Sequence, residues 1–259
     1  MENFGGITLD EVIVFQTQIM MGAQFGRIKK EKAMQEDIII ACLRMGWNDA
    51  FRHTSENTKK EEHNKKKKDC TSILELSEKE WRTKKEHFED YDDFICGNIL
   101  NQKIVLDTFK GFVCSQKTVA KIDCINNNFT GLKTLFQKYK NTDGDKQLCF
   151  GHFQKMFNIA IKLYICLYIC RGHLKIDDRL FDEKIIENIK YADCPIDSII
   201  LEKLSIETGQ NYTTHKWSKY GTPNHPTQNY NEVQTSISKI DKIQGKCNLY
   251  YDFSAWKQF

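Results

Sequence analysis

The chain has 259 residues, 40% of them apolar and 28% charged, which is typical of a folded globular protein and excludes a disordered chain. The net charge of +3 excludes a globally basic nucleic-acid coat, although local basic patches are compatible with it. Three prolines and many Lys, Glu, Ile and Leu residues favour helices. We therefore expect an all-α, multi-helix globular fold. It forms either one domain over residues 1–259 or two helical lobes, residues 1–140 and 141–259.

The first half of the chain predicts separate helices joined by polar segments. Apolar residues at about the helical period, with acidic or capping residues at the starts, indicate these helices. The expected helices cover residues 9–21, 31–53, 77–100 and 131–140. The pattern weakens over residues 101–128, where three consecutive asparagines at 126–128 predict a turn, and residues 141–145 predict another.

Residues 57–69 differ from their surroundings because they contain no apolar side chain and many lysines. Such a segment cannot bury a core face, so we expect a mobile, solvated surface loop. A flexible basic arm that touches a phosphate backbone is the functional alternative.

The most strongly patterned helix begins at Gly151 and continues through an apolar run to Cys170. It is expected to end at residues 171–173, and its apolar residues cover most of its circumference, as in a helix at the centre of a fold. The run from Ile159 to Cys170 is too short for a bilayer and contains Lys162. The sequence therefore predicts a buried core helix, and no membrane partner.

Beyond this helix, charged and apolar residues alternate at helical spacing in several shorter stretches. We expect helices over residues 174–190, 193–208 and 231–243, and an aromatic tail over 250–256 that docks on the core. Pro195 is expected near the first turn of the helix over 193–208, a position that proline favours. Residues 209–230 are polar and rich in turn residues, which predicts an irregular loop.

Ten cysteines raise the question of disulfides or a metal site. No two of them form a C-x-x-C pair, and the spacing of His215 and His225 matches no standard zinc site. Cys166 and Cys170 lie inside an apolar run, where a free thiol behaves as a small apolar residue. The first residues lack the features of a secretory leader. We expect reduced thiols, no metal, no cofactor and a cytoplasmic protein.

One arrangement of residues points to chemistry. Gly151, Lys155 and Asn158 open the central helix, and a later Pro195–Asp197 segment precedes another helix. This order resembles the core of the helix-hairpin-helix DNA glycosylase superfamily. The resemblance implies that Gly151 is the first hairpin glycine, that Lys155 is the nucleophile of the lyase-type members, and that Asp197 is the catalytic aspartate.

The chain departs from the family's pattern at two positions, with Phe153 at the second hairpin glycine and Ile199 at the histidine of the aspartate segment. A glycosylase must also bind nucleic acid and stack an extruded base on aromatic side chains. The residues that we assign to nucleic-acid or substrate binding are Gly151, His152, Gln154, Asn158, Trp217 and Tyr220.

The chemistry of the pair is coherent. A lysine beside an apolar helix is destabilised as an ammonium and becomes a usable amine nucleophile. An aspartate at a helix N-terminus stays ionised and can stabilise positive charge on a sugar as the N-glycosidic bond breaks. The sequence thus favours a diverged glycosylase that acts on DNA or on a modified nucleotide. The alternative is a non-catalytic helical protein of a mobile-element or phage-defence system that binds nucleic acid or another partner. The glycosylase hypothesis requires Lys155 and Asp197 to meet.

Overall fold

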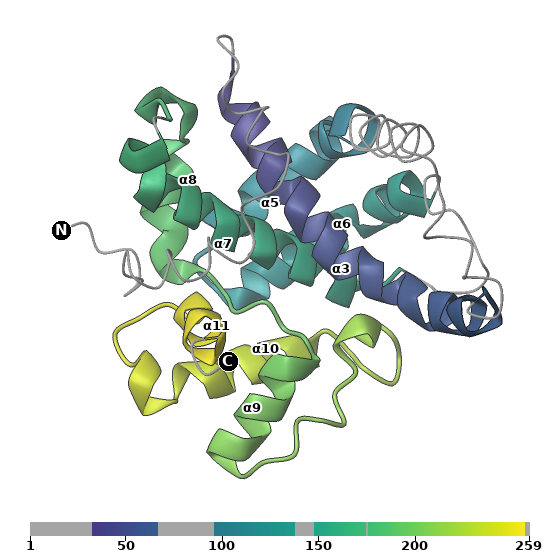
Figure 1. Cartoon of the computed structure of the whole chain (residues 1–259). Coiled ribbons are helices and arrows are strands. Elements are labelled where there is room, and N and C mark those ends of the chain that lie inside the picture. Colours follow the sequence, from purple (N-terminus) through teal and green to yellow (C-terminus); the bar gives the residue numbers. More distant parts are fainter. Residues whose placement is uncertain (1–32, 67–95, 138–147, 175, 257–259) are drawn as a thin grey trace.

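The computed structural model describes residues 33–66, 96–137, 148–174 and 176–256. These segments fold into helices joined by turns and irregular connections (Figure 1), and no strand occurs among the described residues. The expected all-α, multi-helix globular fold is confirmed.

The α-helices are α3 (Gln35–Lys66), α5 (Lys103–Cys114), α6 (Thr118–Gln137), α7 (Phe150–Leu174), α8 (Glu183–Asn188), α9 (Ser198–Thr208), α10 (Gln228–Ser238) and α11 (Leu249–Trp256). A short π-helix, η2, covers Cys96–Leu100. Four 3-10 turns are η3 (Asp178–Leu180), η4 (Ile189–Tyr191), η5 (Trp217–Lys219) and η6 (Asp241–Ile243). In Figure 1, α9, α10 and α11 lie together on one side of the molecule, below α7 and α3.

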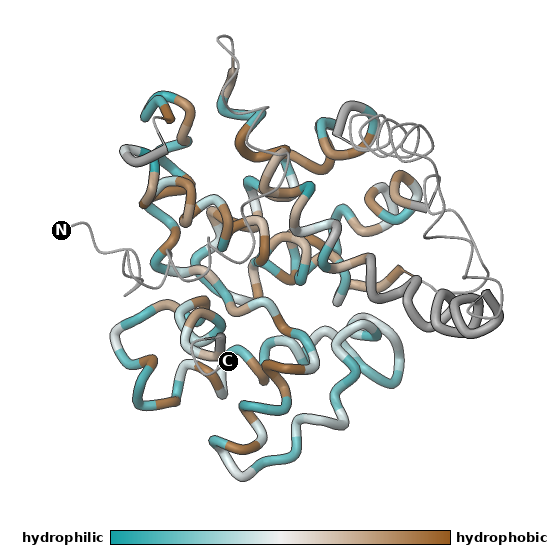
Figure 2. The backbone as a smooth tube through the Cα atoms, viewed as in Figure 1, coloured by the Kyte–Doolittle hydropathy of each residue, from teal (hydrophilic) through white to brown (hydrophobic). Residues whose placement is uncertain are grey.

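The central helix of the fold is α7, as the apolar pattern of its sequence predicts. Residues Phe150–Gly172 are long and apolar enough to cross a membrane, but 83% of the most apolar window is buried inside the protein. Other helices therefore cover its apolar surface, and α7 is a core helix. Figure 2 shows long hydrophobic stretches on α7, whereas the connection between α9 and α10 is mostly hydrophilic.

The α7 helix packs most closely against α3, and a glycine permits the contact. A Cβ atom at Gly46 would overlap the carbonyl oxygen of Met156 and lie 3.3 Å from the backbone nitrogen of Ala160. The two backbones therefore approach to a distance that no larger residue at position 46 allows. This contact fixes the part of α3 that follows Gly46 against the first turns of α7.

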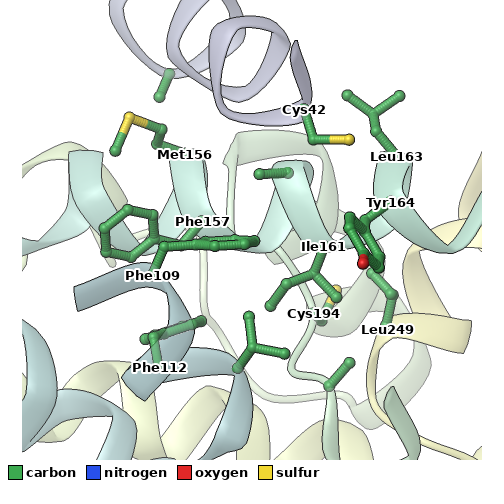
Figure 3. Close-up of a cluster of buried hydrophobic side chains, with 14 of the residues drawn as sticks. Cys42, Phe109, Phe112, Met156, Phe157, Ile161, Leu163, Tyr164, Cys194 and Leu249 are labelled. Atoms are coloured by element: carbon green, nitrogen blue, oxygen red, sulfur yellow. The ribbon is translucent and has the colours of Figure 1, made fainter. Parts of the chain in front are cut away.

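A single hydrophobic cluster joins the described elements, from α3 to α11. Figure 3 shows part of it, with Cys42 of α3 on one side of α7 and Phe109 and Phe112 of α5 on the other. The ring of Phe157 lies 5.7 Å from that of Phe109 and 5.5 Å from that of Phe112. The core thus includes residues from both of the ranges that the sequence divides into two lobes.

Three expectations for the first half of the chain are wrong. The helix expected to begin at residue 131 begins at Thr118, as α6. The helix expected over 31–53 continues to Lys66, so residues 57–66 are helical rather than a loop. Lysine and glutamate have high helix propensity, and they can extend a helix that packing has already started. The asparagines at 126–128 lie inside α6 and form no turn. Buried Ile122 and Ile125 hold this helix to the core, and tertiary packing outweighs the turn preference of asparagine.

The region after α7 is also more broken than expected. Residues 174–190 do not form one helix, because Asp177 and Asp182 each accept hydrogen bonds from backbone N–H groups and start new short turns. The helix expected over 193–208 begins only at Ser198, and Pro195 lies before it, outside any helix. The irregular loop after Thr208 is confirmed, although α10 already begins at Gln228, inside the range expected for that loop. The aromatic tail docks on the core as expected, but as helix α11, which the sequence does not predict. The helix expected over 9–21, most of that over 77–100, and the turn at 141–145 lie outside the described residues.

Candidate functional site

Lys155 lies in the second turn of α7, with its side chain 3% exposed. Its ammonium nitrogen contacts two carboxylates from two other helices. It lies 2.9 Å from Oδ2 of Asp49 on α3 and 3.6 Å from Oδ2 of Asp197 before α9. The lysine and aspartate of the sequence hypothesis therefore meet, although neither contact by itself assigns a reaction.

Asp197 has two roles at once. It is the N-cap of α9, and its Oδ1 accepts a hydrogen bond of 3.0 Å from the backbone N–H of Ile200. That bond satisfies one of the free N–H groups in the first turn of α9 and holds the carboxylate in place. The other oxygen, Oδ2, is the one that faces Lys155. The aspartate is thus oriented by its own helix, and its side chain is 19% exposed.

Asp49 is the residue of this site that the sequence does not reveal. It lies on α3, far from Lys155 along the chain, and is oriented by the close packing of α3 on α7 beyond Gly46. Its side chain is 44% exposed, so this carboxylate connects the buried ammonium to solvent. The only available signal, an aspartate in a predicted amphipathic helix, is the ordinary appearance of a surface residue.

Aromatic rings cover the lysine. The Lys155 nitrogen lies 4.9 Å from the centroid of the Trp217 ring, a cation–π contact with the half-buried indole of η5. His152 packs edge-on to Trp217, with ring centroids 5.9 Å apart, and stacks on Phe51 of α3 at 5.6 Å. The Nδ1 atom of His152 accepts a hydrogen bond from the backbone N–H of Cys149. The structure thus brings Trp217 and His152 to the lysine, as packing partners of its site.

Gln154 and Asn158 lie on the interior side of α7 and are fully buried. The Gln154 side chain binds the backbone of Ile196, and the Asn158 Nδ2 group donates to the hydroxyl of Tyr230 at 2.9 Å. These side chains face the protein rather than the solvent. The substrate-binding role expected for them does not fit this placement, because both are enclosed by the protein's own polar groups.

Gly151 lies inside the first turn of α7 rather than in a hairpin. Its N–H donates to the carbonyl oxygen of Tyr220 at 3.2 Å, and a Cβ atom at this position would overlap the carbonyl oxygen of Trp217. The hairpin role expected for Gly151 is therefore replaced by a packing role. The glycine lets the loop that carries Trp217 approach α7.

Tyr220 directly follows η5 and is fully buried. Its hydroxyl lies 3.4 Å from Nδ1 of His215. Burial, and then the charge of Glu232, raises the pKa of Tyr220, while burial lowers the pKa of His215. The stacking role expected for Tyr220 does not fit a ring that the core already encloses.

The residues that meet are therefore Lys155, Asp49, Asp197 and Trp217. Two carboxylates against one ammonium leave the group with one net negative charge, partly open to water at Asp49. Such a group can hold a cationic centre, or move a proton between the amine and a carboxylate. Among the described residues, no three His, Cys, Asp or Glu side chains gather in a way that could hold a metal ion.

A scan against protein-family models finds no match to this chain. Searches of curated proteins and of solved structures find no significant match either.

Proposed function

We propose that this protein is an enzyme that cleaves the N-glycosidic bond of a modified or damaged base in DNA or of a modified nucleotide. Lys155 is the nucleophile, and Asp197 stabilises the positive charge that develops on the sugar. One observation carries this proposal. Among the described residues, Lys121, Lys155 and Lys162 are buried lysines paired with aspartates, and Lys155 is the one whose partners reach solvent.

The exposed fractions make this difference plain. The aspartates opposite Lys121 and Lys162 are 5% and 4% exposed, whereas those opposite Lys155 are 44% and 19% exposed. Closed Lys–Asp pairs of the first kind can only support the fold. An ammonium between carboxylates that water reaches can exchange its proton and meet a substrate.

The reaction begins when the ammonium of Lys155 gives a proton to Asp49, which passes it to water. The nitrogen lone pair then forms a bond to C1′ of the sugar as the bond from C1′ to the base breaks. The electron pair of that bond leaves with the base, which takes a proton from water. Asp197 faces the positive charge on the sugar during this step. Loss of a proton from the nitrogen and opening of the C1′–O4′ bond give a Schiff base, with the proton on the sugar oxygen.

The test is borohydride trapping on oligonucleotides that carry an abasic site or a modified base. We expect the wild type to form a covalent adduct that peptide mapping assigns to Lys155, and Lys155→Gln to form none. Glutamine can still donate to Asp49 and Asp197, so the site keeps a hydrogen-bonding partner. Lys216→Gln is the matched control, because Lys216 is an exposed lysine beside Trp217. An adduct that persists in Lys155→Gln or is lost in Lys216→Gln contradicts the assignment.

Asp197→Asn separates the charge of this residue from its capping role. Asparagine caps a helix about as well as aspartate, so α9 keeps its N-cap while the carboxylate charge is lost. We expect adduct formation to slow by about 100-fold, the loss typical of removing one charge-stabilising group. Asp197→Ala additionally removes the cap and should cost about 1 kcal/mol of unfolding free energy.

A non-catalytic role as a helical nucleic-acid-binding protein is favoured by a different observation. The Lys121–Asp193 and Lys162–Asp252 pairs use the same two residue types for a purely internal contact. If the contacts of Lys155 are also purely structural, borohydride traps no adduct with any oligonucleotide, while Lys155→Gln still lowers the unfolding temperature. That combined result would replace the enzyme proposal.

We further place the protein in the cytoplasm, acting on DNA or free nucleotides there. The supporting observation is that the eight cysteines whose side chains the structure describes are all free thiols. Reduced thiols are the usual state in that compartment.

A further inference from the structure

The segment of residues 192–197 connects η4 to α9, and it is called here the extended segment because its two end residues, Ala192 and Asp197, have extended backbone angles. It is neither helix nor strand. Ala192, Asp193, Cys194 and Ile196 are at most 4% exposed. Buried backbone N–H and C=O groups must find hydrogen-bonding partners, and the part of the chain that the structure describes contains no strand to supply them.

Two buried glutamines supply these partners in the same way. The amide of Gln154 on α7 accepts from the N–H of Ile196 at 3.3 Å and donates to its C=O at 3.0 Å. The amide of Gln234 on α10 accepts from the N–H of Cys194 at 3.1 Å and donates to its C=O at 2.7 Å. Alternate residues of the extended segment are thus held from two helices.

Two asparagines fix the direction of the glutamine amides. Asn158 Nδ2 donates to Oε1 of Gln154 at 3.3 Å, and Asn248 Nδ2 donates to Oε1 of Gln234 at 3.0 Å. Rotation of either amide by half a turn would place two donors against each other at the asparagine and again at the backbone N–H. Each glutamine therefore has one permitted orientation.

The position of Gln154 links this arrangement to the candidate site. Gln154 directly precedes Lys155, and Ile196 directly precedes Asp197. Two adjacent residues of α7 thus contact two adjacent residues of the extended segment. Gln154 binds the backbone of Ile196, and Lys155 contacts the carboxylate of Asp197.

We propose that Gln154 is a positioning residue that acts through the backbone of Ile196 to hold the Asp197 carboxylate against Lys155. This inference rests on the proposed function for its effect on catalysis, but the positioning itself can be measured without a substrate. A displacement of about 1 Å at a reacting group can cost about 100-fold in rate, so the glutamine affects turnover without touching the substrate.

Gln154→Glu tests the role through protonation. A protonated glutamic acid has one O–H donor and acceptor oxygens, so it can replace both hydrogen bonds to Ile196, whereas an ionised carboxylate can only accept and repels the Ile196 carbonyl. Burial at this enclosed position raises the pKa of a carboxylic acid above its ordinary value of about 4.3, so the side chain should be largely protonated at about pH 5 and ionised toward about pH 8. We therefore expect adduct formation relative to wild type to be largely retained at about pH 5 and to fall by about 100-fold toward about pH 8. Gln154→Leu, which lacks both groups, should be equally slow at every pH. If the rate of adduct formation in Gln154→Glu, divided by that of the wild type, does not change between about pH 5 and about pH 8, the inference is overturned.

The second measurement needs no substrate. Reductive methylation with formaldehyde and borohydride, read by peptide mass spectrometry, reports how often Lys155 becomes accessible in the folded protein. We expect Gln154→Leu to speed the methylation of Lys155 by about tenfold or more while that of buried Lys162 stays at the wild-type rate. Lys162 is the internal control, because it lies two turns further along the same helix and pairs with Asp252.

Gln234→Leu is the matched variant, since it removes the same kind of contact at Cys194 and leaves the contact at Ile196 in place. It should destabilise the protein comparably yet leave Lys155 methylation within about twofold of wild type. Equal acceleration at Lys155 and Lys162 in Gln154→Leu, or none at Lys155, overturns the inference. Absence of any adduct from the wild type overturns the proposed function instead, and the methylation rates then decide the positioning role alone.

Discussion

At the scale of single residues, the core carries charges in pairs. Lys162 of α7 lies 2.5 Å from Oδ2 of Asp252 on α11, with side chains 1% and 4% exposed. Its ammonium also lies 4.9 Å from the ring centroid of Phe253. Burial removes water from both charges, so each depends on the other. Replacing both side chains by apolar residues of similar volume should therefore change net stability little.

Single substitutions in this pair should therefore be worse than a double substitution. Lys162→Met or Asp252→Leu leaves one buried charge without its partner and should lower the free energy of unfolding by about 3–5 kcal/mol. The double variant, which removes both charges, should recover most of that loss. Urea denaturation of the wild type, the two single variants and the double variant gives the four unfolding free energies of this double-mutant cycle. Additive losses in the double variant would mean that the pair does not act as a unit.

The residues of the candidate site were predictable in part. Lys155 and Asp197 follow from the motif resemblance, and the structure brings them together. Asp49 could not be predicted, because its role comes from a contact between helices that are distant in sequence. Gln154 was selected as a substrate contact, and its burial makes it a contact of the protein's own backbone instead.

At the scale of elements, the packing of α3 on α7 determines where Asp49 lies. The contact needs a residue without a side chain at position 46, because the backbone of Met156 occupies the space of a Cβ atom. Helix propensity alone would favour alanine at an interior helical position. The glycine at position 46 is thus explained by the close approach of α7 and not by the helix propensity of α3.

Gly46→Ala should lower the free energy of unfolding by about 1–3 kcal/mol, the usual cost of inserting a carbon into a packed interface. The Gly172→Ala control lies in the exposed end of α7, where nothing lies within 4 Å of an added Cβ atom. There the same change should stabilise the protein by up to about 1 kcal/mol. Thermal unfolding followed by circular dichroism compares the two. A stabilising Gly46→Ala would contradict the close approach of α3 and α7.

Element boundaries show where local reasoning works and where it stops. The continuous apolar pattern after Gly151 predicts α7, whereas the aromatic residues of 250–256 predict a tail docked on the core but not its helical form, α11. The extent of α3 past residue 57 and the passage of α6 through its asparagines were not predicted. Local preferences of lysine and asparagine at those positions are weak compared with helix continuation and with the burial of Ile122 and Ile125.

At the scale of the whole molecule, the burial of thiols makes the free energy of unfolding depend on pH in the alkaline range. Burial raises the pKa of the Cys247 thiol from 9.0 to about 11, and it also raises the pKa values of Cys42, Cys166 and Cys194. Between those two pH values the unfolded chain has lost a thiol proton that the folded protein keeps. The unfolded state then binds fewer protons, so stability must fall as pH rises through this window.

Cys247→Ala should remove part of that pH dependence. At neutral pH the thiol is protonated in both the folded and the unfolded state. The difference in unfolding free energy between Cys247→Ala and the wild type then measures only the lost packing of the side chain. Between about pH 9 and pH 10.5 the variant should lose up to about 1.4 kcal/mol less per pH unit than wild type, the equivalent of one proton. Urea unfolding at several pH values measures both slopes. Parallel slopes would mean that Cys247 ionises equally in both states.

The paired glutamines also have a consequence for the order in which the molecule assembles. The extended segment obtains its hydrogen bonds from α7, which precedes it in the chain, and from α10, which follows it. A chain that is still being synthesised therefore carries Lys155 and Asp197 before the second set of bonds exists. The hydrogen bonds of the extended segment are therefore complete only after α10 has been synthesised and has docked, although the contact of Gln154 with Ile196 needs only α7.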